Sequence, residues 1–569
     1  MADIFDFHFH PLGKQFLSNY DVEELKNDHY SNPVTLPPLG ATLNDLLSRI
    51  LNSQASVSQA RQAGVKLGIA NIITPEYVFA SEKGVLKLLE LDLFGKDVIA
   101  PLDSRIFDFI RKNRNYNFLF EREVGFYGWA STYPDKKSSK IKILTRKEGA
   151  QDNLKMEEGR LNLILAIEGG HNLLNEALDV VFPTNSLSEK IKEYRDKGHN
   201  YDYLYVTLTH LSHVPRVSLC SHAFGFKLVA ANKVNEAVPV LNGLTRKGKE
   251  TIRELMDCSN NEYPILIDIK HMSLKSRFDF YKERSNLLND SAFKAVKKGN
   301  KKWWPIIATH MGITGYRYSE MTELFGEIGF ERGLESSVRI RFERQRKMKV
   351  PVGWGVDHVC FNPMTINLCD DDIEEIAKSN GLIGISLDAR ILGHENFKKR
   401  NNSIDEYDYM SKDDFVRLFP EQAKKIIPLN EIPVEVETEE GFLGFAVRKE
   451  RELYLFCFTL LHVARVIDQL TDKERNNKSG WEFLTIGSDF DGLIDSIKEA
   501  ETATDLPSFR KEVKKALAKA EKSYVEAYDL PDGFEIIPRK SGKLQTDQVI
   551  DMVFGQNGIN FVKEWWGVS

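Results

Sequence analysis

The chain has 569 residues, of which 42% are apolar and 28% charged, and 77 Lys and Arg residues against 83 Asp and Glu residues give a net charge of −6. This balance excludes collagen-like, coiled-coil and wholly disordered proteins. Nucleic acid is not expected as a partner, because no surplus of Lys and Arg is available to replace the counterions of a polyanion.

The cysteines and the apolar stretches bear on where the protein acts. Five cysteines lie far apart without a Cys-x-x-Cys pair, which fits a reducing compartment and indicates neither a disulfide framework nor a cysteine zinc site. The N-terminus lacks the pattern of a signal peptide. The most apolar stretch, 453–464, is shorter than the ~20 residues of a membrane span and predicts a core helix. We expect a cytoplasmic protein without a membrane span, and a homodimer stays an option.

Eight apolar, β-branched runs recur along the chain, at 4–9, 67–73, 161–167, 203–208, 264–269, 305–308, 382–387 and 483–486. Several are apolar almost throughout, as parallel strands covered on both faces are. Helical patterns lie between many of them, including a segment that Thr245 can cap and another at 370–379. This alternation predicts an α/β fold, a (β/α)8 TIM barrel.

The length beyond a minimal barrel is concentrated between particular strands. Segments at approximately 96–160, 318–350 and 390–451 are charged, carry little strand signal and are too long for simple connections. A basic run that begins at Arg339 is interpreted as a solvated helical face. We expect a single domain over 1–569, with the three segments as long insertions near the barrel mouth.

Two histidines stand at the end of the first predicted strand. His8 and His10 are two residues apart, so both imidazoles would face the same side and could bind one metal ion. A His-x-His pair alone is a weak signal. The position of this pair at a strand end strengthens the signal, because the catalytic residues of barrel enzymes lie at the carboxyl ends of the strands.

Five other predicted strands end in metal-capable or proton-transferring side chains, which are Glu168, His210, His271, His310 and Asp489. Each has an ordinary alternative, such as a hydrogen-bonded core histidine, a helix-cap partner or a turn residue. The chain has only 13 histidines, and five of them fall at matching strand ends. That coincidence favours a metal centre.

Glu168 is the informative candidate ligand, because a carboxylate has two oxygens and can bridge two cations. Two metal ions about 3.5–4 Å apart polarise a carbonyl group and lower the pKa of a water between them. Nitrogen and carboxylate ligands suit zinc best, although ligand type also allows Mn, Fe or Co. We expect two divalent metal ions, with Zn²⁺ favoured.

A family resemblance rests on five motifs, which are Ile167–His171, Tyr205–His210, Ile267–His271, Thr309-His310 and Gly487–Gly492. In this order they closely resemble those of the membrane dipeptidase (renal dipeptidase, peptidase M19) family of the amidohydrolase superfamily. The ending Gly558–Trp565 is similar to that family's terminal helix. The resemblance runs from residue 4 to about residue 566, interrupted by the insertions.

The resemblance implies a zinc-dependent hydrolase that cleaves a small, dipeptide-like amide by attack of a metal-bridging hydroxide. It places His8, His10 and Asp489 on one metal ion, His271 and His310 on the other, and Glu168 between them. His210 would contact the substrate carbonyl and stabilise the oxyanion. Asp489 would take the proton from the hydroxide and pass it to the leaving amine.

Two departures from the family pattern bear on the centre and on the substrate. His10 stands where the dipeptidases usually have Asp, and Ile366 stands where they have an Arg that binds the substrate's terminal carboxylate. Arg317 or Arg390 could supply that contact. Otherwise the substrate lacks a free carboxylate, and a lactone, a cyclic amide or an N-acyl amino acid becomes the alternative. A barrel that binds a ligand without catalysis is a third reading.

Overall fold

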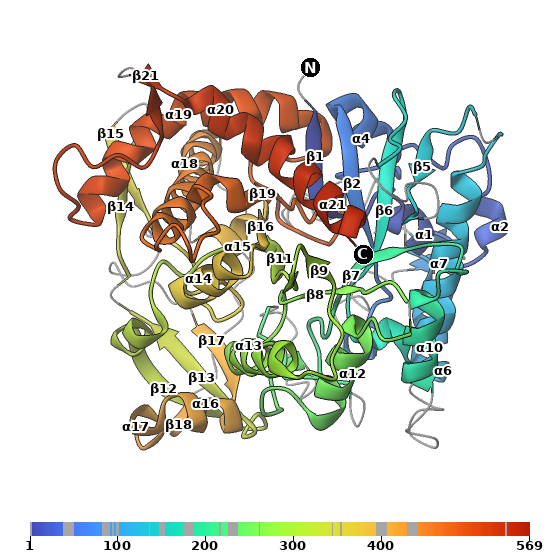
Figure 1. The fold of residues 1–569 in the computed structure, drawn as a ribbon, viewed down its shortest axis with the longest axis horizontal. Helices are drawn as coiled ribbons and strands as arrows, with labels where there is room; N and C mark the ends of the chain where they lie inside the picture. The colour runs from blue at the N-terminus through green and yellow to red at the C-terminus, as the bar shows by residue number, and fades with distance from the viewer. Residues whose placement is uncertain are drawn as a thin grey trace.

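The computed structural model has eight parallel strands at its centre, in the order β1-β2-β6-β7-β8-β11-β16-β19 (Figure 1). Their bounds are β1 Ile4–Phe9, β2 Val65–Ile72, β6 Leu161–Ile167, β7 Tyr203–Thr207, β8 Leu266–Asp268, β11 Ile307–Met311, β16 Leu382–Ile385 and β19 Leu484–Ile486. The described residues are 3–37, 51–81, 92–93, 96–97, 102–135, 137–146, 154–175, 186–214, 218–225, 237–260, 262–343, 345–352, 355–393, 407–429, 442–540 and 543–568.

Backbone contacts between the first and last strands bring the sheet round on itself. The His10 amide donates to the Phe490 carbonyl oxygen at 3.0 Å, and the Asp489 amide donates to the His8 carbonyl oxygen at 2.8 Å. With the helices between strands, this makes the predicted (β/α)8 barrel, which is confirmed. Each of the eight predicted runs overlaps one barrel strand, and the sixth is displaced, because β11 begins at Ile307 and extends to Met311.

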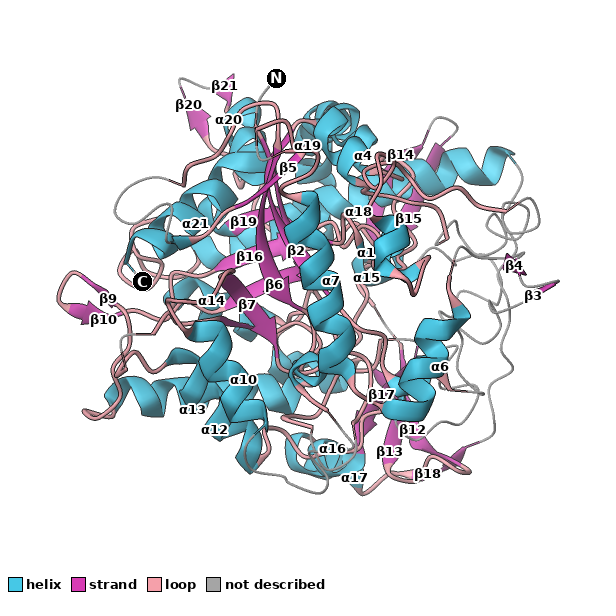
Figure 2. Cartoon of the chain, turned by 90° about the vertical axis from the view of Figure 1, so that its right-hand side faces the viewer, coloured by secondary structure: helices cyan, strands magenta, loops and turns pink. Residues whose placement is uncertain are grey.

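Helices surround the barrel strands (Figures 1 and 2). They are α1 Gly13–Leu17, α2 Val22–Leu25, α4 Val57–Ala63, α5 Tyr77–Ala80, α6 Ser104–Asn113, α7 Tyr116–Ala130, α10 Ser186–Arg195, α12 Arg246–Met256, α13 Leu274–Asn289, α14 Asp370–Lys378, α15 Ala389–Leu392, α16 Lys412–Leu418, α17 Pro420–Ala423, α18 Phe442–Asp468, α19 Leu506–Ala527, α20 Thr546–Asp551 and α21 Asn557–Val568.

Local sequence explains where several helices begin and which face they bury. As predicted, Thr245 caps a helix: its hydroxyl accepts from the Gly248 amide at 2.9 Å at the start of α12, whose Ile252 and Leu255 are buried. The predicted core helix is the middle of α18, where Phe456 and Leu460 are fully buried. Among the described helices, none combines the length and the apolar character needed to cross a membrane.

A second sheet, which the sequence reading missed, lies in the segments between barrel strands. Its order is β17-β13-β12-β18, with bounds β12 Phe325–Glu331, β13 Ser337–Phe342, β17 Tyr407–Ser411 and β18 Ile427–Leu429. These segments follow the carboxyl ends of β11 and β16, so the sheet lies beyond the barrel mouth (Figures 1 and 2). The strands form there although the sequence of these segments carries little strand signal.

The basic run that begins at Arg339 is also corrected, because it starts in β13 and not on a helix. Val338, Ile340 and Phe342 are buried apolar residues at every second position, a period of two that the arginines between them obscured. Arg339 pairs with Glu331 at 2.6 Å. Parts of the predicted insertions, at 98–101, 136, 147–153, 344, 394–406 and 430–441, lie outside the described residues.

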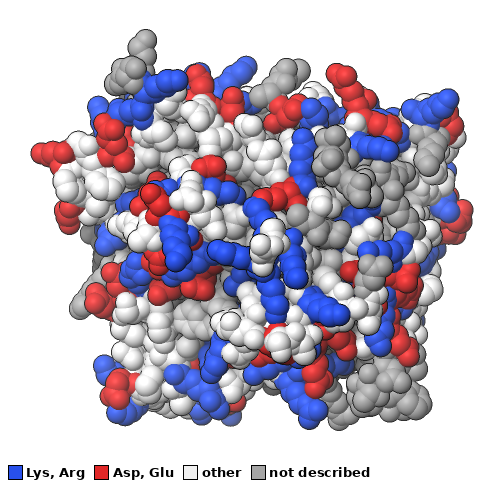
Figure 3. Space-filling view, viewed as in Figure 1, with Lys and Arg blue, Asp and Glu red and all other residues white. Residues whose placement is uncertain are grey.

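The remaining strands are short. A hairpin joins β14 Met348–Val352 to β15 Gly355–Val359, β5 Ile141–Ile143 pairs with β6, and three two-stranded pieces are β3 Asp92–Leu93 with β4 Lys96–Asp97, β9 Lys297–Lys298 with β10 Lys301–Lys302, and β20 Arg539–Lys540 with β21 Lys543–Leu544. Basic and acidic side chains are interspersed over the face drawn in Figure 3. The net acidic charge is therefore not gathered in one region of that face.

Candidate metal centre and its cavity

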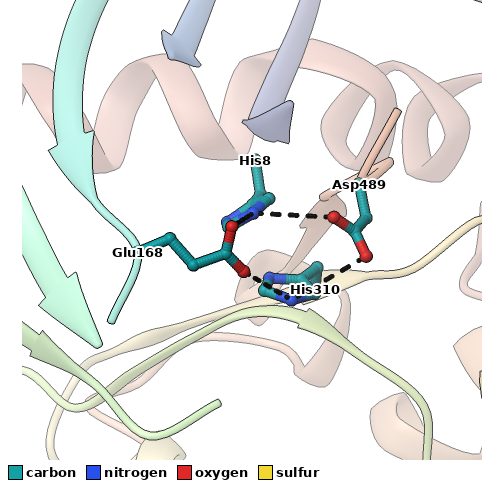
Figure 4. A group of neighbouring side chains, drawn as sticks. All are labelled: His8, Glu168, His310 and Asp489. Carbon is teal, nitrogen blue, oxygen red and sulfur yellow. Dashed lines mark ion pairs between the residues drawn. The ribbon is translucent and has the colours of Figure 1, made fainter. Parts of the chain in front are cut away.

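The candidate ligands predicted from strand ends lie together at the carboxyl end of the barrel. Potential ligand atoms of His8, Glu168, His310 and Asp489 are all within 4.8 Å of one another (Figure 4), and so are those of Glu168, His210 and His271. Glu168 belongs to both groups. The barrel thus brings side chains from six strand ends to one place.

The Glu168 carboxylate lies between two pairs of histidines. Its Oε2 is 3.3 Å from His8 Nε2 and 3.2 Å from His10 Nε2. Its Oε1 is 3.3 Å from His271 Nε2 and 3.6 Å from His310 Nε2. Each oxygen therefore faces a different pair of imidazole nitrogens.

Asp489 faces the same histidines from the other side. Its Oδ1 is 3.7 Å from both His8 Nε2 and His10 Nε2, and its Oδ2 is 4.0 Å from His310 Nε2. The Asp489 side chain is 15% exposed, whereas that of Glu168 is 3% exposed. Of the two carboxylates, Asp489 is the one more open to the surroundings.

Hydrogen bonds on the outer side of the first two histidines decide which nitrogen carries a proton. His10 Nδ1 lies 3.0 Å from the Asn71 carbonyl oxygen, which only accepts, so Nδ1 donates. His8 Nδ1 lies 3.0 Å from the Tyr205 hydroxyl, which gives its own hydrogen to the Phe7 carbonyl oxygen at 2.8 Å. In the neutral rings both Nε2 atoms therefore present lone pairs to the centre, as metal-binding histidines do.

His310 is oriented in the same way. Its Nδ1 is 2.9 Å from the Thr309 hydroxyl oxygen, and that hydroxyl donates to Asp268 Oδ2 at 2.6 Å. His310 Nδ1 is therefore the donor, and its Nε2 faces His271 Nε2 at 3.2 Å. Two buried imidazole nitrogens at this distance share at most one proton, and a cation would satisfy both.

The buried imidazole nitrogens and carboxylates of this centre suit a divalent metal ion. His8 Nε2 and His10 Nε2 are buried without a hydrogen-bond partner among the described residues. Burying such groups is costly unless something compensates them. Burial would raise the pKa of Glu168, but the facing His8, His10 and His271 lower it well below its ordinary value. The centre is therefore an anionic, nitrogen-rich cluster, which suits zinc and similar ions.

The pKa of His10 also reflects the negative charge of the neighbouring carboxylates. Burial lowers its pKa, but the facing Asp489 and Glu168 carboxylates outweigh burial and raise the pKa to about 10. In His271 and His310 burial dominates and lowers the pKa well below its ordinary value. Either a proton on His10 or a metal ion would balance the two carboxylates.

Two candidate ligands occupy the left-handed backbone region without being glycine. His271 has φ 65° and Asp489 has φ 63°. Such a conformation costs roughly 1–2 kcal/mol per residue and persists where the surroundings impose it, often at functional sites. Both residues belong to the candidate ligand groups.

His210 is held by a carboxylate that the sequence reading missed. Its Nδ1 is 2.9 Å from Glu76 Oε1, and its Nε2 is 3.8 Å from Glu168 Oε1. Burial lowers the pKa of His210, but Glu76 outweighs burial and leaves it raised. Burial would raise the pKa of Glu76, but His210 lowers it to about 2. Glu76 closely follows the second barrel strand, so the strand-end rule could have found it.

A cavity of about 150 Å³ opens onto the centre. His10, Glu168, His210, His271 and Asp489 line one side of it. Most of the remaining wall is apolar and includes Leu17, Ile73, Pro75, Phe79, Leu102, Phe107, Leu211, Ile366, Ile391, Leu493 and Ile494. The cavity therefore combines a polar centre with an apolar wall, as small-molecule sites commonly do.

The two arginines considered as carboxylate ligands are placed differently. Arg390 lines the cavity and makes a two-pronged contact with Asp388, at 3.0 Å from Nε to Oδ1 and 2.6 Å from Nη2 to Oδ2. Arg317 pairs with Glu374 and is not among the described residues that line the cavity. Ile366 lines the cavity.

Lys270 is a further residue that the sequence reading did not single out. It lines the cavity and is 1% exposed. Burial lowers the pKa of Lys270 to about 8, so most molecules carry the charge at pH 7. Strand alternation from the buried Asp268 could have indicated that Lys270 faces inward.

Comparisons with known proteins place the chain beside solved hydrolases only distantly. No family model matches it, and no curated protein matches it. Solved structures that match include a dipeptidase described as a metallopeptidase of family M19, 13% identical over 100% of this chain and 99% of the other, with a TM-score of 0.41.

Two further matches are similar in extent. A metallopeptidase from Rhodobacter sphaeroides, solved with a phosphinate mimic of the dipeptide L-Ala-D-Ala, is 13% identical over 99% of each chain, with a TM-score of 0.42. The probable dipeptidase PvdM from Pseudomonas aeruginosa is 12% identical over 91% of this chain and 88% of the other, with a TM-score of 0.39. With TM-scores this low, neither the fold nor the function of this chain is inferred from them.

Proposed function

We propose that the protein is a metal-dependent hydrolase of a small amide, with a dipeptide-like compound as the default substrate. The observation that carries the proposal is the Glu168 carboxylate, whose two oxygens face separate histidine pairs beside a cavity of about 150 Å³. A bridging carboxylate among neutral imidazoles is the ligand set of a two-metal hydrolytic site.

The proposed ligands divide into two sets that share Glu168. His8, His10 and Asp489 would hold one ion, and His271 and His310 would hold the other. Zinc is favoured by the nitrogen and carboxylate donors. When bound, such ions polarise a carbonyl group and make water acidic enough to attack it near neutral pH.

His210 would bind the carbonyl oxygen of the scissile amide. It lines the cavity, and Glu76 holds its Nδ1 at 2.9 Å, so that Nε2 faces the centre. A hydrogen on Nε2 would stabilise the negative charge that develops on the carbonyl oxygen as water adds. Glu76 keeps the pKa of His210 raised and so favours the protonated form.

Asp489 would move the proton. Its carboxylate lines the cavity and is 15% exposed, so it can reach both an attacking water and the departing nitrogen. It would accept a proton from the water as the new C–O bond forms and deliver it to the amine as the C–N bond breaks. The apolar wall would exclude other water and hold apolar parts of the substrate.

The test combines metal analysis with a substrate panel. We expect purified protein to hold a stoichiometric transition metal and to hydrolyse one or more dipeptides, and His271→Ala to lose activity. Absence of the metal, or full activity in His271→Ala, would contradict the proposal. Metal-dependent hydrolysis of any amide would exclude the alternative that the barrel binds a ligand without catalysis.

A second substrate class has one observation in its favour. Ile366 lines the cavity, Arg390 is engaged by Asp388, and Arg317 lies outside the lining. If no cation received a carboxylate, the same centre would act on a lactone, a cyclic amide or an N-acyl amino acid. A panel in which free dipeptides react fastest would eliminate this alternative.

A further inference from the structure

One buried cation faces the cavity without an internal partner. Lys270 is 1% exposed and lines the cavity together with Glu168, His271 and Asp489. Among the described residues, its ammonium makes no hydrogen bond or salt bridge, and nearby carboxylates, Asp489 foremost, act on its charge only from a distance. A buried charge is ordinarily paired, so this one calls for an explanation.

Two other described cations near this cavity have acidic partners, the buried Lys14 and the more exposed Arg390, whose side chain is 45% exposed. Lys14 lies 3.1 Å from Asp491, and Arg390 lies 2.6 Å from Asp388. Both Asp491 and Asp388 line the same cavity. The acidic side chains closest to the chemistry, Glu168 and Asp489, face histidines instead.

We propose that Lys270 binds a carboxylate of the substrate, so that the preferred substrates are amides that carry a carboxylate group. This inference rests on the proposed function and names its substrate class. A lysine ammonium offers three donors and a compact charge, which suits a carboxylate oxygen that arrives from the cavity. Among the described lining residues the others are apolar or already have a charged partner, so Lys270 is the cation of the described wall that is left to receive an anion.

The single charge favours a carboxylate over a phosphate. A phosphate group carries up to two charges and is ordinarily bound by several donors together. In this cavity Lys270 is the one described cation without an acidic partner, and Arg390 is engaged by Asp388. Metal ions in the centre would add positive charge beside Lys270 and increase the attraction for an anion.

The experiment compares Lys270→Met and Lys270→Arg with the wild type in the full chain loaded with zinc. Each protein hydrolyses a free dipeptide and the same dipeptide with its C-terminus amidated. We expect Lys270→Met to raise KM for the free dipeptide by about 30-fold or more and to change KM for the amidated one by less than about threefold. Lys270→Arg restores part of the difference because it keeps the charge.

A binding measurement separates this inference from the proposed function. Calorimetry uses the dipeptide with CH2–NH in place of the amide, with and without its carboxylate, and needs no turnover. Loss of carboxylate-dependent binding in Lys270→Met supports the inference even if the wild type hydrolyses no amide. Equal loss for both ligands, loss of zinc from Lys270→Met, or a wild type that prefers the amidated compounds would overturn it. The inference would also be overturned if Arg390→Met, and not Lys270→Met, abolished the carboxylate-dependent binding.

Discussion

The backbone amide of Asp489 donates a 2.8 Å hydrogen bond to the carbonyl oxygen of His8, and this bond joins the last barrel strand to the first. Both residues are proposed metal ligands. Asp6 strengthens the same seam, because its carboxylate accepts from the Ser488 amide at 2.9 Å and from the Ser488 hydroxyl at 2.5 Å. The contacts that close the barrel therefore also bring the proposed ligands His8 and Asp489 together.

Metal ions should stabilise the folded chain. If ions bind the proposed ligands in the folded state alone, free metal at 100 times its Kd adds about 2.7 kcal/mol, or about 2 °C in Tm for a chain of this length. We expect protein stripped by a chelator to melt lower and to recover when zinc is added. The same addition should leave His310→Ala unchanged at low metal concentration. Equal recovery in that variant would place the metal elsewhere.

The hydrogen bond from Ser488 to Asp6 should hold the barrel seam closed. Ser488→Ala leaves a buried carboxylate short of a donor, which costs about 1–3 kcal/mol and should speed amide exchange at 484–491 about tenfold. Thr485→Val is the matched control, because the buried Thr485 hydroxyl has no partner among the described residues. Hydrogen exchange followed by mass spectrometry checks both. Equal exchange in the two variants would contradict the role given to Ser488.

Glu168→Gln should lower the metal content and the activity together. The amide keeps the shape but loses the charge and one acceptor oxygen, so we expect at most one ion per chain and a loss of activity of more than about 100-fold. Glu123→Gln is the matched control, because burial raises the pKa of Glu123 to about 8 and the neutral acid predominates at pH 7. Elemental analysis that shows two ions in Glu168→Gln would remove Glu168 as the bridge.

Glu76→Gln should move the pH profile of the reaction. Burial lowers the pKa of His210 and Glu76 raises it, so loss of the charge lets the pKa fall. The protonated form is then lost at lower pH, and the alkaline limb of kcat should shift to lower pH. The loss at neutral pH should be smaller than the about 100-fold expected for His210→Ala. If the alkaline limb of kcat stayed at the same pH in Glu76→Gln, His210 would not act through its proton.

The pairing of Glu76 with His210 should also make the free energy of unfolding depend on pH in the acid range. Burial would raise the pKa of Glu76, but His210 lowers it from 4.5 to about 2. A depressed pKa contributes stability that is present above pH 4.5 and is lost as the pH falls through about 2, here about 3 kcal/mol. In metal-free protein, Tm should fall less between pH 5 and 2 in Glu76→Gln than in the wild type. Parallel curves would contradict the predicted pairing.

Much of the fold was predictable from local pattern. Barrel strands such as β6 and β16 are buried throughout, so they occur in the sequence as nearly continuous apolar runs. The second sheet was not predicted, because β13 has only three apolar residues interspersed with polar and charged ones, and beside its neighbour β12 it pairs with β17, about seventy residues away. Pairing over that distance leaves no local trace.

The sequence by itself determined the eight strands and the residue types at their ends, because strand periodicity and the chemistry of imidazole and carboxylate are local properties. Only the tertiary structure decided that the two oxygens of Glu168 face different histidine pairs, that Glu76 holds His210, and that Lys270 is buried without a hydrogen-bonded partner in the described part of the chain. Distances, burial and pKa shifts depend on which strand ends lie opposite one another, and barrel closure sets that arrangement.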